Sequence, residues 1–445
     1  MEDRKYLTIV LTEGGEPKIA PMAQLIDPQA GTSSEVRDFF FQPLTEVLES
    51  GIGFRKCPTL SDPEWIYSGV ERVLSSVQSG RDFLQRFFKW LPSGIAVSPY
   101  FKALRSSRRE EKVAQVDLLL RQLADQRLSN PFKIFPELEG FDLYAGDGHY
   151  VENATHDPKT GDTHWPTGHF FAMDLKTQTL RSLCVADRQG RKKEQDMRAL
   201  KRFDREQLRQ GAAVKRKVLW VWDKAGVDLN FWKKSKQSGV YFLCMKKENQ
   251  CLERVKEREI DFEQKINEGV QWDHVVVDRR GIEIREIGFY NPSEGMHYVY
   301  ITSEMTLEPG LLVLLYTIRW GIEKIFDETK NKFNQQKSWG TSESAKKTQA
   351  HFVCMAHNLT LLLEQRLESE HGIRNEAEIQ RKKKREEDLV QELEKQEESR
   401  PWLYSFLRRF SQTSYKLVRW LRSHWKINSS LTNALNQLTL LYSKL

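Results

Sequence analysis

The sequence predicts a mixed α/β protein in which a strand-rich centre lies between helical regions at both ends. Apolar residues recur at helical spacing through the first 135 residues, whereas short apolar runs separated by turn residues begin near Phe141. From about residue 364 the composition is dominated by charge. The chain has 445 residues, a length that allows about two to four domains.

The first part of the centre, residues 136–249, shows a distinctive order of elements. We predict strands at 141–150, 169–175 and 179–185, a charged helix at 193–209, a strand at 218–223, a helix around Trp232 and a fifth strand at 240–246. Three strands, a helix and a fourth strand is the order that opens a ribonuclease-H-like fold. In such a sheet the first and fourth strands are neighbours, so we expect a ribonuclease-H-like catalytic core.

Residues 250–306 are predicted to form a β-rich insertion in this core, because they stay strand-like and rich in turns. The core resumes over residues 307–365. Pro309 begins an apolar helical run there, and a second apolar helix covers 352–363. The first of these helices is the one that carries the most informative side chains.

Helical regions are expected on either side of the core. In the N-terminal domain, residues 1–135, we predict helices at 62–77, around residues 83–89 and at 108–127. In the C-terminal region, residues 366–445, the charged segment 364–398 is predicted to be a solvated helix or a semi-rigid spacer. One amphipathic helix is then predicted from the apolar residues Leu403, Leu407, Phe410, Leu417 and Leu421, with Arg408, Arg409, Arg419 and Arg422 on its flanks.

Bulk properties narrow the functional classes only slightly. Lys and Arg exceed Asp and Glu by 69 to 62, so the net charge of +7 suits a negatively charged partner. The five cysteines are scattered, which predicts neither a zinc site nor a disulfide framework. The first residues lack the pattern of a signal peptide, and no apolar stretch is long enough to span a bilayer. We expect a cytoplasmic protein without membrane insertion.

The helix that begins at Pro309 carries an unusual combination of side chains. At about 100° per residue, Tyr316, Arg319, Glu323 and Lys330 fall within an arc of about 60° on one helical face. This face presents one carboxylate beside two cations and a phenol. A carboxylate can hold a magnesium ion, and a guanidinium can grip a phosphate with two parallel hydrogen bonds.

Glu323 alone cannot satisfy Mg²⁺, which prefers octahedral oxygen coordination. Asp147 and Asp223 stand at the ends of the predicted first and fourth strands, so they are the best candidates for the other ligands. Two metal ions about 4 Å apart would activate the attacking oxygen and stabilise the leaving oxygen at phosphorus. We expect two Mg²⁺ ions, for which Mn²⁺ could substitute.

The spacing Y-x2-R-x3-E-x6-K, met by Tyr316, Arg319, Glu323 and Lys330, resembles the signature of DDE transposases of the insertion-sequence-4 family. DGHY at 147–150 and VWDKAGVD at 221–228 resemble the settings of that family's two catalytic aspartates. The resemblance covers about residues 140–365. It implies that Asp147, Asp223 and Glu323 form the metal-binding triad, and that Tyr316, Arg319 and Lys330 hold the DNA backbone.

The resemblance also implies a reaction and partners. Such enzymes cut double-stranded DNA at the terminal inverted repeats of an insertion sequence and join the 3′-hydroxyl ends to target DNA. Two ends must be held together, so we expect a homodimer in a synaptic complex, bound to DNA at the nucleoid. Members with a β insertion are associated with a hairpin intermediate, for which Trp272 is a weak candidate to stack a flipped base. A core aromatic is the alternative reading of Trp272.

Several alternatives remain open from the sequence. The basic N-terminal helices either recognise the terminal repeats or cap the catalytic domain. The chain could be a domesticated or inhibitory protein that binds ends without cutting them. A ribonuclease-H-like nuclease such as a junction resolvase would cut DNA without rejoining it. His149 either touches a phosphate or is a strand histidine without catalytic duty.

Overall fold

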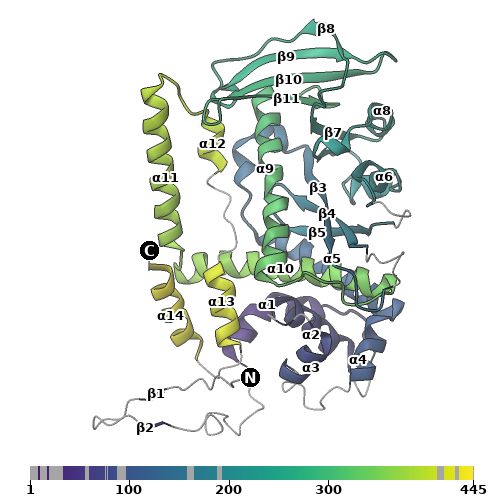
Figure 1. The fold of residues 1–445 in the computed structure, drawn as a ribbon, viewed down its shortest axis with the longest axis vertical. Helices are drawn as coiled ribbons and strands as arrows, with labels where there is room; N and C mark the ends of the chain where they lie inside the picture. The colour runs from purple at the N-terminus through teal and green to yellow at the C-terminus, as the bar shows by residue number, and fades with distance from the viewer. Residues whose placement is uncertain are drawn as a thin grey trace.

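A computed structural model gives the fold (Figure 1) and describes residues 9–10, 18–19, 34–55, 60–75, 77, 79–87, 97–157, 165–187, 193–407, 415–425 and 430–443. Nine strands form one sheet in the order β5-β4-β3-β6-β7-β11-β10-β9-β8. Their bounds are β3 Phe141–Val151, β4 Thr167–Asp174, β5 Leu180–Val185, β6 Lys217–Val221, β7 Val240–Met245, β8 Glu253–Glu257, β9 Val270–Val277, β10 Glu283–Asn291 and β11 Met296–Thr302. The mixed α/β class is therefore confirmed.

The first five of these strands agree with the predicted ones. β3 pairs antiparallel with β4, and β4 pairs antiparallel with β5, whereas β3, β6 and β7 run parallel to one another. The predicted adjacency of the first and fourth strands is thus confirmed. Alternate residues of β6 enter two apolar cores, with Leu219 and Val221 on one face and Val218 and Trp220 on the other. A strand buried on both faces explains the continuous apolar run in this segment.

The charged segment after β5 is not the single helix that was predicted at 193–209. It forms two short helices, α6 (Asp196–Leu200) and α7 (Arg205–Arg209). Asp204 starts the second helix, because its side chain accepts a hydrogen bond from the Gln207 backbone while the Gln207 side chain accepts one from the Asp204 backbone. This capping box begins a new helix where charge alone suggested continuity. The 3₁₀ turn η5 (Lys224–Gly226) and α8 (Leu229–Lys236) follow β6.

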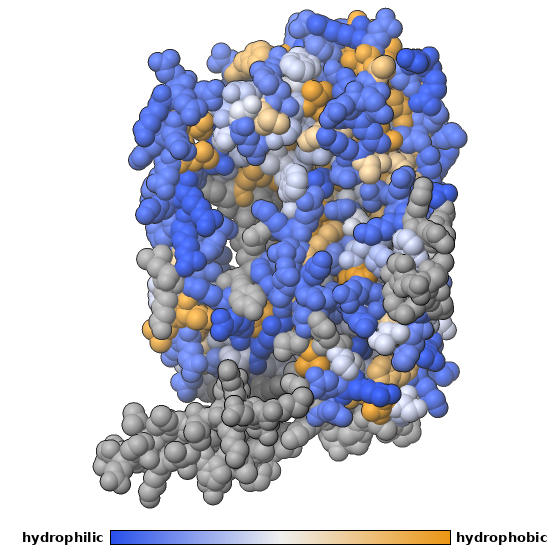
Figure 2. Space-filling model, in the orientation of Figure 1, coloured by the Kyte–Doolittle hydropathy of each residue, from blue (hydrophilic) through white to orange (hydrophobic). Residues whose placement is uncertain are grey.

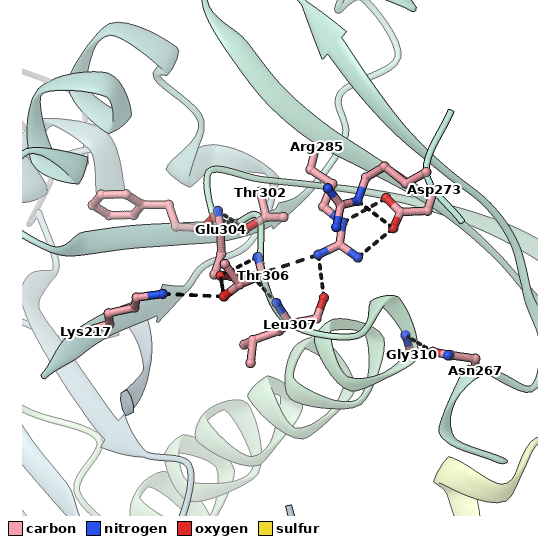
Figure 3. A network of polar contacts seen from close by, with 11 residues as sticks. Lys217, Asn267, Asp273, Arg285, Thr302, Glu304, Thr306, Leu307 and Gly310 are labelled. Atoms are coloured by element: carbon pink, nitrogen blue, oxygen red, sulfur yellow. Dashed lines mark hydrogen bonds and ion pairs between the residues drawn. The ribbon is translucent and has the colours of Figure 1, made fainter. Parts of the chain in front are cut away.

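The predicted β insertion extends the core sheet. β8 to β11 form an antiparallel meander, and β11 pairs with β7, so these strands continue the sheet sideways (Figure 1). Buried ion pairs connect this meander to the segment that leads into the next helix. The side chain of Arg285 contacts Asp273 at 2.6 Å and donates to the carbonyl oxygen of Leu307 at 2.6 Å (Figure 3). Arg285 and Asp273 are each only 1% exposed.

α9 (Pro309–Asp327) packs against β3, β6 and β7 on the sheet face opposite α6 and α8. Its apolar run is buried, and Pro309 stands in its first turn, where a missing backbone N–H costs nothing. One prediction about this helix is wrong. Lys330 does not continue its face at regular spacing, because α9 ends at Asp327 and residues 328–332 form the π-helical turn η7 (Glu328–Lys332).

α10 (Glu343–His371) crosses the molecule between the sheet and the N-terminal helices (Figure 1). These helices are α1 (Glu35–Glu49), α2 (Asp62–Leu74), α3 (Gly80–Phe87), α4 (Val97–Leu104) and α5 (Ser107–Arg127), and the short turns η3 (Pro131–Ile134) and η4 (Pro136–Leu138) follow. The predicted start of α2 is confirmed by a capping box at Ser61 and Glu64. α2 ends at Leu74 rather than at residue 77. Phe88 and Lys89 lie outside the described residues, and a pair of short strands, β1 (Ile9–Val10) and β2 (Lys18–Ile19), was not predicted.

The charged segment predicted at 364–398 is divided between two helices, because residues 364–371 are the last turns of α10 and only the remainder forms α11 (Glu376–Lys395). Figure 2 shows a predominantly hydrophilic outer surface over α11. The single amphipathic helix predicted beyond it is wrong. α12 (Trp402–Leu407) packs against α9, whereas α13 (Tyr415–His424) packs against α1 and α14 (Leu431–Ser443) at the other end of the molecule. Arg408, Arg409 and Phe410 lie outside the described residues. None of the described helices has the length and apolar character needed to cross a bilayer.

We predict that Arg285→Met will lower the free energy of unfolding by about 3–5 kcal/mol, because it leaves a carboxylate buried without its main counter-charge. Chemical denaturation measures this change. Arg254→Met is the matched control, since Arg254 pairs with Glu257 on the exposed strand β8. Loss of this exposed ion pair should lower the free energy of unfolding by less than about 1 kcal/mol. Equal losses for the two variants would contradict the assigned role of the buried pair.

Candidate active site

The neighbouring strands β3 and β6 bring Asp147 and Asp223 together, but Asp147 lies within β3, four residues before its end at Val151, and not at a strand end as predicted. β3 and β6 pair in parallel with Tyr144 opposite Trp220 and Ala145 opposite Val221. The same offset, continued by two residues, sets Asp147 opposite Asp223. Neighbouring strands lie about 4.8 Å apart, and side chains two residues apart share a face. Both aspartates therefore belong to the face on which Ala145 and Val221 pack and against which α9 lies.

The pKa of Asp147 is affected by its acidic neighbours. The pKa of its carboxyl is raised to about 6, mainly by burial and also by the charges of Asp223 and Glu323, whereas the Gly148 backbone and Arg319 act to lower it. One carboxylate oxygen accepts a hydrogen bond from the Gly148 N–H at 2.7 Å. Asp147 thus interacts electrostatically with both other members of the predicted triad, although these three residues are far apart along the chain.

Asp223 lies just after β6 and caps the 3₁₀ turn η5. Its Oδ1 accepts a hydrogen bond from the backbone N–H of Ala225 at 2.7 Å. This contact fixes the side chain next to the strand end, as is usual for an aspartate in a turn. It occupies one carboxylate oxygen with a backbone donor and leaves further acceptor capacity on the side chain.

Glu323 is half-buried on α9 and pairs with Arg319 one turn before it, with 2.9 Å between Oε1 and a guanidinium nitrogen. Arg319 itself is buried, and its Nε has no hydrogen-bond partner among the described residues. Its guanidinium lies 5.3 Å from the centre of the Tyr316 ring. Burial raises the pKa of Tyr316 to about 12, so this phenol stays protonated at neutral pH. The face offers a buried cation with a free donor, which suits a phosphate oxygen.

Lys330 reaches the same region from the turn η7. The pKa of His149 is lowered to about 4, mainly by burial and also by the charge of Lys330, so the two side chains are electrostatic neighbours. The His149 ring stacks on Phe326 with 4.7 Å between ring centres. Lys330 is exposed, and a single residue of β3, Gly148, separates His149 from Asp147, so the exposed ammonium lies on the same side as the acidic side chains.

Asp196 is a fourth acidic residue here, and the sequence did not single it out. The pKa of Asp196 is raised to about 7, mainly by burial and also by the charges of Asp223 and Asp147. A Cβ atom built on Gly148 would lie 3.3 Å from a carboxylate oxygen of Asp196. α6, which begins at Asp196, packs against η5. The residue stood within a charge-rich segment predicted to be one helix, so only the tertiary packing distinguishes it from its neighbours.

The acidic residues are chemically suited to a divalent metal ion. Their donors are carboxylate oxygens, which Mg²⁺ prefers, and a cation would offset the repulsion that helps to raise the pKa of Asp147 and Asp196. Within the part of the chain that the structure describes, no group of three acidic, histidine or cysteine side chains already surrounds a metal position. Glu323 instead faces Arg319, so metal binding would require its carboxylate to turn.

Trp272 does not interact with these residues. It lies on β9, four strands away from β6, which corresponds to about 19 Å across the sheet. Its ring covers Gly288 on β10, where an added Cβ would approach the indole to 2.2 Å. The ring also lies over His274, with 6.2 Å between ring centres. The structure therefore gives Trp272 packing partners within the meander.

A cavity of about 480 Å³ borders the site along α9. Its walls include the aromatic side chains of Tyr300, Tyr316 and Trp320, and Trp320 is 51% exposed. Lys324 also borders the cavity, and its pKa is lowered by burial and by the charge of Lys382 on α11. The acidic residues themselves do not line it, so the cavity is a neighbouring surface rather than the acidic site.

Residues 154–359, just under half of the chain, match the family model of the transposase DDE domain. The matched segment includes Asp223 and the residues Tyr316, Arg319, Glu323 and Lys330, and it begins seven residues after Asp147. No curated protein matches the chain. The match supports a transposase function and an enzyme that acts on DNA strands, independently of the side-chain geometry.

We predict a pH-dependent gain in stability for Asp196→Asn, measured by urea unfolding without divalent cations. The folded-state pKa of Asp196, about 7, exceeds the ordinary value of 3.8. The contribution of the Asp196 carboxyl to the free energy of unfolding is therefore fully favourable below about pH 3.8 and is lost as the pH rises through about 7. Relative to the native protein, the free energy of unfolding of the variant should therefore be higher at pH 8 than at pH 5 by about 2–3 kcal/mol.

Asp187→Asn is the control for that experiment. Asp187 is an exposed carboxylate in the segment between β5 and α6, and its side chain is 54% exposed. Its substitution should change stability by a similar small amount at both pH values. If Asp196→Asn behaved in the same way, Asp196 would not be a buried member of the acidic group.

Proposed function

We propose that this chain is a DDE transposase of the insertion-sequence-4 type, which cuts DNA at the ends of a mobile element and joins those ends to target DNA. The match to the transposase DDE domain supports the reaction class. The strand order β5-β4-β3-β6-β7, with β3, β6 and β7 parallel, supports a ribonuclease-H-like core. The Y-x2-R-x3-E-x6-K spacing supports the family.

The observation that carries this proposal is the parallel register of β3 and β6. The pairing ends at Ala145 and Val221, and its extension by two residues supports a position of Asp147 near Asp223 on the face that α9 covers, while the charge of Glu323 on that helix acts on Asp147. Three carboxylates from distant segments at one sheet edge can share divalent cations. Asp147, Asp223 and Glu323 would hold Mg²⁺, with two ions expected and Mn²⁺ as a substitute, and the metal would supply Lewis-acid activation of the phosphodiester and the attacking oxygen.

The remaining residues of the site would bind and orient DNA. Arg319 has an unpaired buried Nε beside Glu323, so it would donate to a phosphate oxygen next to the cleaved bond. Tyr316 keeps its proton at neutral pH and would donate from its hydroxyl. Lys330 is exposed on η7 and would contribute a point charge to a neighbouring phosphate. Breaking the ion pair between Glu323 and Arg319 would free the carboxylate to bind metal and the guanidinium to bind phosphate.

The partners follow from the reaction. The protein would bind double-stranded DNA at terminal inverted repeats and at a target, act as a homodimer that holds two ends together, and reside in the cytoplasm at the nucleoid. A junction-resolving nuclease would share the carboxylates but would release cut products. Detection of a 3′-hydroxyl end joined covalently to a target duplex therefore separates the proposed function from a nuclease.

We predict that Glu323→Gln will reduce cleavage of a DNA fragment bearing the element end by on the order of 10³-fold or more, because one metal-binding carboxylate is lost. Binding of the uncut end, measured by gel shift, should remain within about threefold. Asp327→Asn is the matched control, one turn later on α9, where the exposed carboxylate contacts Asn331. Cleavage by Glu323→Gln at the native rate would refute the proposed triad.

We predict that Lys330→Ala will weaken binding to all DNA sequences alike and reduce the slope of log affinity against log salt by about 1, because one phosphate contact disappears. Gel shifts at several salt concentrations measure the slope. Lys234→Ala provides an equal loss of charge on α8, against the opposite face of the sheet. An identical slope change in both variants would show a general charge effect rather than a contact at Lys330.

A further inference from the structure

A small cavity of about 20 Å³ lies behind the acidic site. It is lined by side chains from β3, β4, α9, η7 and α10, and its apolar walls include Phe171, Phe326 and Val353. Its polar lining consists of His149 of β3, His169 of β4 and Thr329 of η7, together with the side chains of Gln335 and Gln349. The cavity therefore joins the strand that carries Asp147 to the turn that carries Lys330.

Three polar atoms that border this cavity have no hydrogen-bond partner among the described residues. They are His149 Nε2, His169 Nδ1 and Thr329 Oγ1, and each is shielded from solvent. His149 and His169 stand directly opposite each other in the antiparallel register of β3 and β4. Buried polar atoms in folded proteins are almost always paired, with protein groups or with ordered water. Three such atoms around one cavity indicate a common ligand.

The chemistry of the lining selects a water molecule. A neutral imidazole offers one donor and one acceptor, and a hydroxyl offers both, so the three atoms can satisfy a water that donates and accepts. A buried water needs a cavity of roughly 10–15 Å³ and about three partners, which this cavity provides. The lining has no carboxylate or thiolate to hold a metal ion. The two nearby glutamines already bond to Trp339, so they do not compete.

We propose that this cavity binds one structural water molecule, which is hydrogen-bonded to His149, His169 and Thr329 and fastens the η7 turn to β3 and β4. His149 follows Asp147 by two residues on the same strand face, and Thr329 immediately precedes Lys330. π-helical turns frequently occur at functional sites, and this one has a polar anchor at its centre. The water is a positioning element that sets Lys330 relative to Asp147, a consequence that rests on the proposed function.

A crystal structure of the full chain without DNA tests the binding site itself. We expect one ordered density peak within about 3.2 Å of His149 Nε2, His169 Nδ1 and Thr329 Oγ1. A cavity without density would overturn the proposal, and so would a peak with anomalous scattering, because that peak would be a metal ion. In Thr329→Val, which keeps the shape but lacks the hydroxyl, the peak should disappear or move. An unchanged peak would exclude Thr329 as a ligand.

Measurements of cleavage and DNA binding test separately whether the water positions Lys330. Thr329→Val should lower cleavage of an element end by about tenfold, the equivalent of one lost hydrogen bond, and should alter the salt slope of DNA binding. Thr329→Ser restores the hydroxyl and should return cleavage to within about threefold of the native rate. Loss of the water without any change in cleavage or binding would refute positioning. If the native protein did not cleave DNA, the proposed function would fail while the crystallographic result would still decide the water site.

Discussion

The burial of several carboxylates close together at one end of neighbouring strands is the constraint on which the rest of the structure depends. The pairing of β3 with β6 sets Asp147 opposite Asp223, and α9 brings Glu323 within electrostatic reach. Burial and these neighbours raise the pKa of Asp147 to about 6, so its charged form is disfavoured in the folded protein. Buried Arg319 offsets part of this charge. Interactions elsewhere must therefore hold the cluster together.

α9 receives that support at both ends. Before its first turn, buried Arg285 binds both a carboxylate of the meander and the carbonyl oxygen of Leu307 (Figure 3). After its last turn, Arg422 of α13 donates to the carbonyl oxygens of Lys332 in η7 and of Leu74 in α2. The β meander and the C-terminal helices thus act on the same helix from opposite ends. Both regions stabilise the acidic site without contributing a carboxylate to it.

The sequence predictions were accurate where neighbouring residues determine the structure and inaccurate where contacts between distant segments determine it. The strands of the core were predictable because continuous apolar runs mark strands buried on both faces. Capping at Ser61 is equally local. The errors arose where packing overrides the local pattern. Charge suggested one helix where Asp204 begins a second, and apolar spacing suggested one helix where α12 and α13 pack at opposite ends of the molecule.

The sequence by itself determined which groups could do chemistry, because fixed spacing on a helix places Tyr316, Arg319 and Glu323 on one face. Only the tertiary structure decided which groups meet. It set Asp147 opposite Asp223, added Asp196 and moved Lys330 onto a π-helical turn. Such contacts join segments separated by tens of residues, and their geometry depends on sheet register and helix packing, which no local pattern encodes.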